Sequence, residues 1–147
     1  MEASSRSIRH LSPEEVDAVG MALGLARLHQ GNGFYLVAWE GDEPAGHLHL
    51  ALTSPPELQD VFVRPEFRRR GIGRALTEVA EREATNRGFD RMRLTVGIDN
   101  LQAQALYLSC GYLDTGAPPR RVQGTIQVRT GPIEVDDTLL IWEKALS

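Results

Sequence analysis

At 147 residues with a net charge of −4, the chain has the length of a single domain, residues 1–147, and lacks the basic composition of a general nucleic-acid binder. Its single cysteine, Cys110, excludes an internal disulfide and a cysteine metal cluster. No apolar run approaches the length of a membrane span and the first residues lack the apolar core of a signal peptide, so we expect a cytoplasmic protein with neither a nucleic-acid nor a membrane partner.

The first half of the chain predicts a strand, a helix and a hairpin. Residues 7–11 can form a short strand, and the Ser-Pro-Glu-Glu sequence that follows is typical of a helix that begins at Pro13. Apolar residues keep helical spacing until the glycines of 31–33. The two strand-like segments 34–40 and 45–52, joined by a short turn, then predict an antiparallel hairpin.

Two histidines, His47 and His49, lie two residues apart on the second hairpin strand and therefore share one face. Such a pair could bind a metal or relay a proton. Two histidines without a third ligand make a poor metal site, however, and a half-solvated strand face accommodates histidine readily. We therefore expect ordinary half-solvated side chains there and no metal site.

A strand, a tight turn and the start of a helix follow one another in the centre of the chain. The apolar run Val61–Val63 predicts the strand, Pro65 ends it, and Gly71 and Gly73 open a helix over 73–87. The first turn of a helix has unpaired N–H groups and the positive end of the dipole, and glycines there let an anion approach the backbone. A phosphate is the expected ligand. The residues after Gly73 fit neither the Walker loop nor the dinucleotide-binding loop.

Strict alternation along the strand 57–63 divides its side chains between two faces. One face would hold Glu57, Gln59, Val61 and Val63, and the other Leu58, Asp60 and Phe62. Because residues an odd number of positions apart point to opposite sides, we expect Glu57 and Asp60 on opposite faces. Their two carboxylates could then not reach the same ligand.

The second half of the chain predicts a strand over 91–96, a helix over 101–110 and a last strand over 138–144. Asn100 stands immediately before the helix, where its side chain suits an N-cap. The segment 116–137 is longer than a hairpin turn needs, and long segments of this kind are more often functional than idle. We expect an extended loop or a β-ribbon there.

Two motifs, in order and suitably spaced, resemble those of one superfamily. The first is Arg68-x-x-Gly71-x-Gly73 behind a strand, which is similar to the acyl-CoA pyrophosphate loop of the GNAT superfamily of acetyl-CoA-dependent N-acetyltransferases. The second is Asn100-x-x-Ala103-x-x-Leu106-Tyr107-x-x-x-Gly111-Tyr112, which matches the second motif of that superfamily. The similarity covers about residues 34–113.

The resemblance implies a mixed α/β (α+β) fold, in which a mostly antiparallel central sheet is flanked by helices and a splayed pair of strands holds acyl-CoA. It implies an enzyme that moves an acetyl group from acetyl-CoA directly to a primary amine of an unidentified acceptor, without a metal. Two alternatives stay open: a non-catalytic acyl-CoA-binding or sensing module, and an acetyltransferase that acts on a protein or peptide amine. From Asp114 onward the chain departs from the common family pattern, and from its length we expect segment 116–137 to flank the acceptor site or to serve as an edge ribbon in a homodimer.

In the resemblance, the splayed strand pairs its free backbone groups with the pantetheine amides, the glycine loop wraps the pyrophosphate, and the cap asparagine contacts the cofactor arm. The residues implied in cofactor binding are Val61, Phe62, Val63, Arg68, Arg69, Arg70, Gly71, Ile72, Gly73, Arg74, Asn100, Ala103 and Tyr107.

The resemblance also implies catalytic roles. Tyr107 would protonate the leaving thiolate, and a carboxylate on the strand 57–63 would take a proton from the amine. Glu57 occupies the position where some family members carry a glutamate base, whereas Asp60 lies nearer the thioester. On the family position alone we favour Glu57 over Asp60 as the base.

Overall fold

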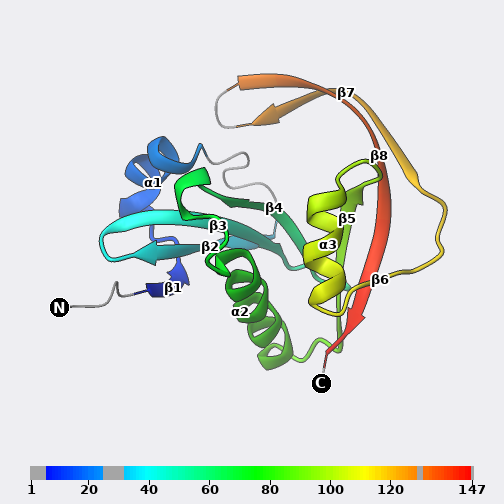
Figure 1. Cartoon of the computed structure of the whole chain (residues 1–147), viewed down its shortest axis with the longest axis horizontal. Helices are drawn as coiled ribbons and strands as arrows, with labels where there is room; N and C mark the ends of the chain where they lie inside the picture. The colour runs from blue at the N-terminus through cyan, green and yellow to red at the C-terminus, as the bar shows by residue number, and fades with distance from the viewer. Residues whose placement is uncertain (1–5, 25–31, 129–130, 147) are drawn as a thin grey trace.

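The computed structural model describes residues 6–24, 32–128 and 131–146. In these residues one sheet has the strand order β1-β2-β3-β4-β5-β8-β6, and β7 pairs with β8 (Figure 1). The strands are β1 (Arg6–His10), β2 (Gly33–Glu40), β3 (Glu43–Ala51), β4 (Glu57–Val63), β5 (Arg91–Gly97), β6 (Leu113–Asp114), β7 (Arg120–Val128) and β8 (Gly131–Ala145). The helices are α1 (Val16–Leu23), α2 (Ile72–Asn86) and α3 (Leu101–Ser109), with short 3₁₀ turns at Pro13–Glu15 and Pro65–Phe67.

The helix predicted from Pro13 begins there as a 3₁₀ turn and continues as α1. The carboxylate of Glu15 accepts a hydrogen bond from the Ser12 N–H at 3.3 Å, which fixes the helix start. α1 ends at Leu23, earlier than predicted, because Gly24 adopts a left-handed conformation with φ 61. The rest of the predicted helix falls on residues 25–31, which lie outside the described residues.

The sheet is mixed and mostly antiparallel, as predicted. β1 to β4 form an antiparallel meander, and β5, β6 and β7 each pair antiparallel with β8. β4 and β5 are parallel, and they share only two pairs, Glu57 opposite Arg93 and Leu58 opposite Leu94. Beyond these pairs the two strands separate, which confirms the predicted splayed pair.

Each face of the sheet carries a hydrophobic core. The larger core packs α2 and α3 against one face, and the smaller core packs α1 against the other. Neighbouring residues of β2 divide between them, since Leu36 lies in the larger core and Tyr35 and Val37 lie in the smaller one. The α2 face and the α1 face of the sheet are therefore distinct environments.

A β-bulge interrupts the regular alternation of β4. Across the ladder with β3, His49 lies opposite Gln59 but His47 lies opposite Phe62, so β4 uses one residue more than β3 over this step. At this step Asp60 adopts a left-handed conformation with φ 52. Because of the extra residue, each side chain after Asp60 points to the face opposite to the one that strict alternation would give it.

The bulge reassigns the side chains that follow it. Val61 and Val63 pack with Leu58 in the larger core, on the α2 face, whereas Phe62 packs against the smaller core, on the α1 face. The strict alternation predicted for 57–63 was therefore wrong, because it placed Leu58 and Phe62 on one face and Val61 and Val63 on the other.

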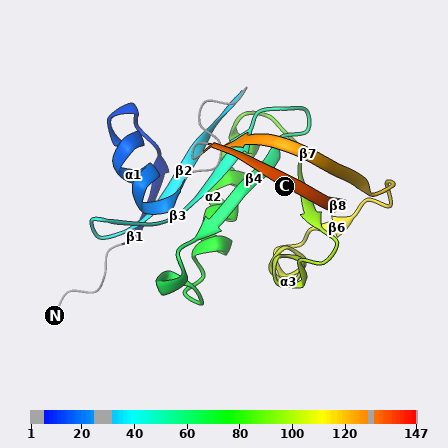
Figure 2. The ribbon, with the colours of Figure 1, turned by 90° about the horizontal axis from the view of Figure 1, so that it is seen from above.

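β7 and β8 form a two-stranded ribbon that continues the last strand beyond the sheet, and they lie side by side in Figure 2. Their pairing runs without a register shift from Arg120 opposite Leu139 to Val128 opposite Gly131. Only residues 139–145 of β8 pair with β5, and β8 runs antiparallel to it. The ribbon therefore projects past the carboxyl end of β5, and the last strand begins well before the predicted 138–144.

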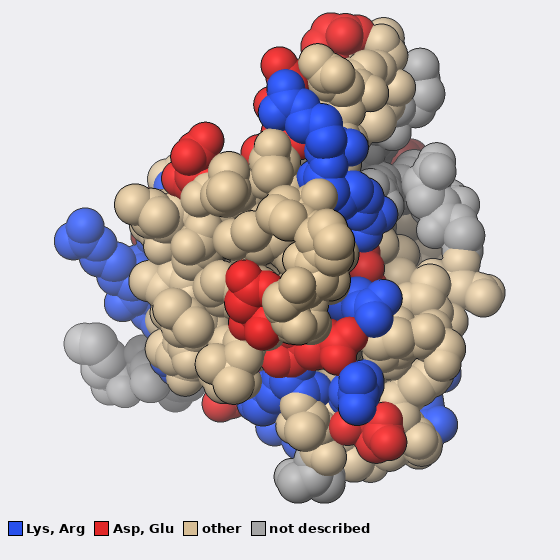
Figure 3. Space-filling model, turned by 90° about the vertical axis from the view of Figure 1, so that its right-hand side faces the viewer, with Lys and Arg blue, Asp and Glu red and all other residues tan. Residues whose placement is uncertain are grey.

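On the side of the molecule seen in Figure 3, positive and negative side chains are interleaved. Arg121 on β7 forms an ion pair with Asp136 on β8, and Arg91 on β5 forms one with Glu143 on β8. Charges on these strands therefore neutralise one another within the sheet.

Candidate functional site

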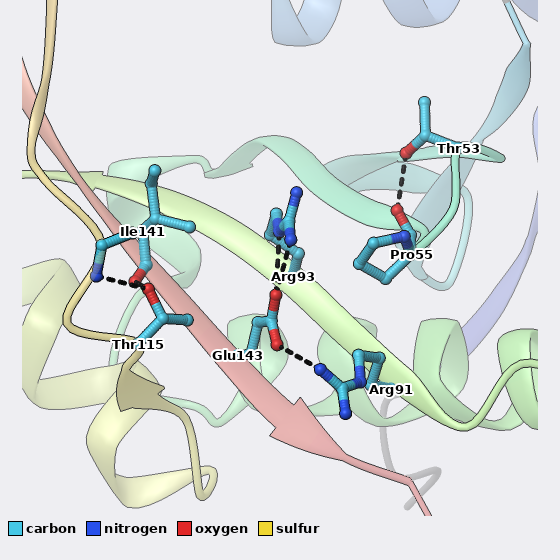
Figure 4. A network of polar contacts seen from close by, with 8 residues as sticks. Thr53, Pro55, Arg91, Arg93, Thr115, Ile141 and Glu143 are labelled. Atoms are coloured by element: carbon cyan, nitrogen blue, oxygen red, sulfur yellow. Dashed lines mark hydrogen bonds and ion pairs between the residues drawn. The ribbon is translucent and has the colours of Figure 1, made fainter.

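β4 and β5 diverge after their two shared pairs, and we call this divergence, between residues 59–63 and 95–97, the β4–β5 fork. β8 holds β5 in place, since it pairs with β5 along its whole length. The carboxylate of Glu143 on β8 strengthens this join by accepting hydrogen bonds from Arg91 at 3.0 Å and from Arg93 at 2.7 Å (Figure 4). The β5 side of the β4 backbone therefore has no strand partner along the fork among the described residues.

The loop after β4 presents backbone N–H groups at the start of α2. Gly71, the residue before α2, has φ 76, and Arg69 is also left-handed with φ 65. Among the described residues, no side chain caps α2, no acidic residue lies in its first turn, and the N–H groups of Ile72, Gly73 and Arg74 have no backbone acceptor. A Cβ placed on Gly71 would meet no atom within 4 Å. The N-terminus of α2 is thus open to an anion.

Side-chain contacts hold the loop in this conformation without using those N–H groups. The guanidinium of Arg68 donates to the Val63 carbonyl at 3.0 Å, and that of Arg70 lies 5.2 Å from the centre of the Phe67 ring. The Arg70 carbonyl accepts a hydrogen bond from Arg6 on β1 at 3.0 Å. The loop is therefore braced against both β1 and the end of β4.

The start of α2 also lies against α3 and the end of β4. A Cβ on Gly73 would come within 3.3 Å of the Leu106 side chain and 4.0 Å of the Val63 side chain. Arg74 donates to the Ser109 carbonyl at 3.3 Å and to its hydroxyl at 2.5 Å. The open N–H groups thus lie beside the fork, and the guanidinium of Arg74 is bound to α3.

α3 places two of the predicted residues. Asn100 is the N-cap, since its side-chain oxygen accepts a hydrogen bond from the Ala103 N–H at 3.1 Å. Tyr107 is 7% exposed, and its hydroxyl has no hydrogen-bond partner among the described residues. Burial raises the pKa of Tyr107, so its phenol stays protonated at neutral pH. The neighbouring Tyr112 differs, because its hydroxyl donates to Glu81 at 2.8 Å.

On the α1 face, a cluster of polar side chains, the polar group, surrounds Asp60. The Tyr35 hydroxyl donates to Asp60 Oδ2 at 2.8 Å, and His47 Nδ1 lies 3.9 Å from the same oxygen. His47 is 1% exposed, which corrects the expectation of a half-solvated histidine. Burial lowers the pKa of His47 more than the nearby Asp60 carboxylate raises it, so the ring is neutral at neutral pH.

Glu57 belongs to the same face through a second chain of contacts. Gln59 donates to the Glu57 carboxylate at 3.0 Å, and its amide oxygen lies 3.0 Å from His49 Nδ1. His49 is buried as well and packs edge-on against the Tyr35 ring. Glu57 and Asp60 therefore lie on one face, and the prediction of opposite faces was wrong because the bulge at Asp60 breaks the alternation.

Sequence reasoning missed Tyr35 and Gln59 as members of this polar group. In the structure the hairpin pairs Tyr35 directly opposite His49, and this pairing depends on a register shift between Ala38 and Trp39 that the sequence does not mark. Nothing in the sequence marks the bulge that brings Asp60 to the Tyr35 hydroxyl.

A metal centre, a membrane span and a separate surface hollow are the alternatives to this site. No group of three or more His, Cys, Asp and Glu side chains in the described part of the chain is placed to hold a metal ion. None of the described helices is long and apolar enough to cross a membrane. A surface hollow lies along the second half of α2 and the end of β8, where Glu78, Arg82 and Lys144 line it. This hollow is polar and far along α2 from its N-terminus.

Comparison with known proteins gives a family match. Residues 5–112 match the model of the acetyltransferase (GNAT) family. The mycothiol acetyltransferase of Catenulispora acidiphila is 38% identical over 88 residues, which are 54% of this chain and 28% of that protein. An uncharacterized N-acetyltransferase of Bacillus subtilis, YvbK, is 31% identical over 77 residues, 51% of this chain and 50% of that protein. The aligned part spans about a quarter to a half of the length of these relatives.

Solved structures share the fold over nearly the whole chain. The ribosomal-protein-S18-alanine N-acetyltransferase of Escherichia coli has a TM-score of 0.74 and 22% identity, with 97% of this chain and 95% of that chain covered. Nourseothricin acetyltransferase has a TM-score of 0.74 and 18% identity, with 97% and 99% covered. The predicted resemblance is confirmed, and the chain belongs to the acetyltransferase (GNAT) family.

Proposed function

We propose that this protein transfers the acetyl group of acetyl-CoA directly to a primary amine. The observation that carries the proposal is the β4–β5 fork beside the open N-terminus of α2, whose first N–H groups have no backbone acceptor among the described residues. Membership of the GNAT family supports the same reaction.

The fork and the loop fit an elongated donor with an anionic end. The free backbone edge of β4 at Val61–Val63 would pair with the pantetheine amides, and the N–H groups of Arg69–Arg74 would hold the pyrophosphate. The open space beside Gly71 leaves room for the phosphate oxygens. Asn100 and Ala103 would contact the arm from the start of α3. Bound there, acetyl-CoA supplies an activated thioester carbonyl.

Two groups of the chain would act on that thioester. A backbone N–H of β4 near Val61–Val63 would donate to the carbonyl oxygen as negative charge develops on it. Tyr107 would give its proton to the departing sulfur, a role supported by a phenol that is protonated at neutral pH and that has no partner among the described residues. A carboxylate of β4, Glu57 or Asp60, would take a proton from the amine.

Direct transfer is favoured over a covalent route through Cys110. Burial raises the pKa of the Cys110 thiol more than the nearby Arg74 lowers it. The thiol therefore stays protonated at neutral pH, where it is a weak nucleophile.

The β7–β8 ribbon would flank the acceptor. It projects past the carboxyl end of β5, which is the open end of the fork, and Asp137 at its base lies against Gly97. A homodimer formed through the free edge of β7 would use the same ribbon for a different purpose. We also propose that the protein is located in the cytoplasm.

Thiol release from acetyl-CoA, measured with a panel of primary amines, tests the proposal. The panel should contain an alanine-starting peptide, nourseothricin and spermidine, which are named for its structural neighbours, together with a lysine peptide. Amine-dependent thiol release with an acetylated product supports acetyl transfer. Tight binding of acetyl-CoA without turnover on any amine would instead favour an acyl-CoA-binding or sensing module.

A further inference from the structure

Asp60 has features that an ordinary strand residue does not need. It has φ 52, a conformation that costs free energy in a non-glycine residue unless the surroundings hold it. It lies in the bulge of β4, and bulges beside active sites commonly redirect a side chain. Its side chain remains 18% exposed, although Tyr35 and His47 beside it are buried. A strained residue with a partly exposed carboxylate points to a functional role.

Asp60 and Glu57 differ in their position along the fork. Glu57 lies opposite Arg93, where β4 and β5 are still paired, and its carboxylate accepts a hydrogen bond from Gln59. Asp60 lies two residues beyond Leu58, the last residue of β4 that pairs with β5. Asp60 is therefore at the open part of the fork and Glu57 at its closed end.

Two buried side chains contact the same oxygen of Asp60. The Tyr35 hydroxyl donates to Oδ2 at 2.8 Å, which fixes the orientation of the carboxylate. His47 Nδ1 lies 3.9 Å from Oδ2 and makes no hydrogen bond among the described residues. At 3.9 Å the two atoms lie beyond hydrogen-bond distance, so His47 packs beside the carboxylate without bonding to it.

The side chains linked to Asp60 on this face come from three strands. They are Tyr35 on β2, His47 and His49 on β3, and Glu57 and Gln59 on β4. Tyr35 also belongs to the smaller core, with Val19 and Leu23 of α1. The histidines and Glu57 are the titratable neighbours whose charge would act on Asp60.

We propose that Asp60 accepts the proton of the acceptor's ammonium group and that Tyr35 positions its carboxylate. The inference rests on the proposed acetyl transfer and names the base that this reaction requires. Tyr35 holds the carboxylate through its hydroxyl, and the buried His47 ring packs beside the same oxygen.

The protons of the reaction balance as follows. One N–H bond of the ammonium breaks and an O–H bond forms on Asp60, which leaves a lone pair on nitrogen. That lone pair forms the C–N bond to the acetyl carbon, the C–S bond breaks, and the sulfur takes the Tyr107 proton. A second proton from nitrogen restores Tyr107, directly or through water. The proton on Asp60 leaves to solvent through the exposed part of its side chain, so one proton is released per turnover.

The pH dependence of kcat/KM in Asp60→Asn and Glu57→Gln separates the two carboxylates. Asparagine tolerates the left-handed conformation and keeps an oxygen for the Tyr35 hydroxyl, so the bulge should survive. We expect Asp60→Asn to lower kcat/KM at neutral pH by about 10²-fold or more and to abolish the acidic limb of the profile. Glu57→Gln should keep that limb. Thermal melting and acetyl-CoA affinity close to the parent's would show that the Asn variant is folded.

Tyr35→Phe and His47→Phe test whether the Tyr35 hydroxyl positions the carboxylate of Asp60. Loss of that hydroxyl removes the donor to the carboxylate, so the acidic limb should move to higher pH by about 0.5–1 unit. His47→Phe removes a buried ring that makes no hydrogen bond to Asp60, so the limb should stay close to the parent's position. A purely structural role of Tyr35 would lower the stability of both variants and leave the limb in place in both.

The outcomes separate the two proposals. Retention of the acidic limb in Asp60→Asn, with its loss in Glu57→Gln, would overturn the assignment and leave acetyl transfer intact. Retention of the limb in both variants would also overturn it. If the parent protein releases no thiol with any amine, acetyl transfer fails, and the role of Asp60 fails with it.

Discussion

The two faces of β4 are built in different ways where they meet the fork. On the α2 face, the groups available to a ligand are mainly backbone N–H groups at the start of α2, and the loop that presents them is one short stretch, 68–74. On the α1 face, the polar group around Asp60 consists of side chains from β2, β3 and β4. Backbone groups survive most substitutions, whereas a single hydroxyl or imidazole does not.

This difference teaches which changes should matter on each face. A backbone site fails when a side chain fills the ligand's space, so its sensitive positions are glycines. A side-chain site fails when one atom is removed, so isosteric variants are informative there. Tyr107 is a side-chain site in this sense, although it lies in the core on the α2 face.

The largest effect is expected for Tyr107→Phe, which removes one hydroxyl that has no partner among the described residues. We expect kcat to fall by about 10²-fold or more, with little change in KM for acetyl-CoA, because the variant loses a general acid. Steady-state kinetics across pH measure this.

Tyr112→Phe is the matched control for that variant. It removes a hydroxyl that donates to Glu81 from a ring 6.0 Å away from the Tyr107 ring. It should lower the free energy of unfolding by about 1 kcal/mol and leave kcat near the parent's value. A parent-like kcat in Tyr107→Phe at every pH would reduce Tyr107 to a packing residue.

A large effect is also expected for Gly71→Val on the backbone site. The added side chain would occupy the open space next to the N–H groups, and φ 76 is unfavourable for a β-branched residue. We expect the affinity for CoA to fall by about tenfold or more, measured by calorimetry.

Gly88→Val controls for backbone strain in that experiment. Gly88 has φ 91, also lies in open space, and follows the opposite end of α2. It should lose a similar amount of stability and keep its affinity for CoA. Gly73 is less suitable, because a Cβ there would press on Leu106. Equal affinities of Gly71→Val and Gly88→Val would remove the loop from the proposed site.

An effect of intermediate size is expected on the pH dependence of stability, through the buried His47. Burial lowers the pKa of His47 below its ordinary value of 6.5, so below about pH 6.5 the unfolded chain binds a proton that the folded chain does not. The free energy of unfolding should therefore fall as pH drops from about 7.5 through 6.5, by at most about 1.4 kcal/mol per pH unit. Urea unfolding at several pH values should show a shallower slope in His47→Phe. An unchanged slope would mean that folding does not lower the pKa of His47.

The smallest effects are expected for the arginines of the loop. Arg68→Ala and Arg74→Ala remove exposed charges near the proposed pyrophosphate, and exposed charges contribute modestly. CoA affinity should fall by a few-fold, and the loss should shrink as salt is added. A loss as large as that of Gly71→Val would show that side chains, rather than the backbone, dominate this face.

The sequence predicted the α2 face well because its signals are local. The bounds of β4 match the predicted 57–63, Gly71 precedes α2 as expected, and Asn100 caps α3. Each of these depends on a few neighbouring residues, such as a glycine before a helix or an asparagine that accepts from the third residue after it.

The α1 face could not be predicted in the same way. The bulge at Asp60 depends on how β4 pairs with β3, and one inserted residue changes the face of every side chain after it. His47 and His49 were expected to be half-solvated, but the smaller core around α1 buries them. Likewise, the length of β8 depends on pairing with β7 rather than on a local signal.

Backbone amide shifts in a CoA titration, followed by NMR on ¹⁵N-labelled protein, test the central claim most directly. The claim is that the donor lies along the β4–β5 fork with its pyrophosphate on the start of α2. We predict the largest shifts at Arg69–Arg74 and at Val61–Val63, with little change at Glu78–Asn86 along the hollow of α2. Shifts confined to Glu78–Asn86 and the end of β8, with the loop amides unchanged, would contradict the account.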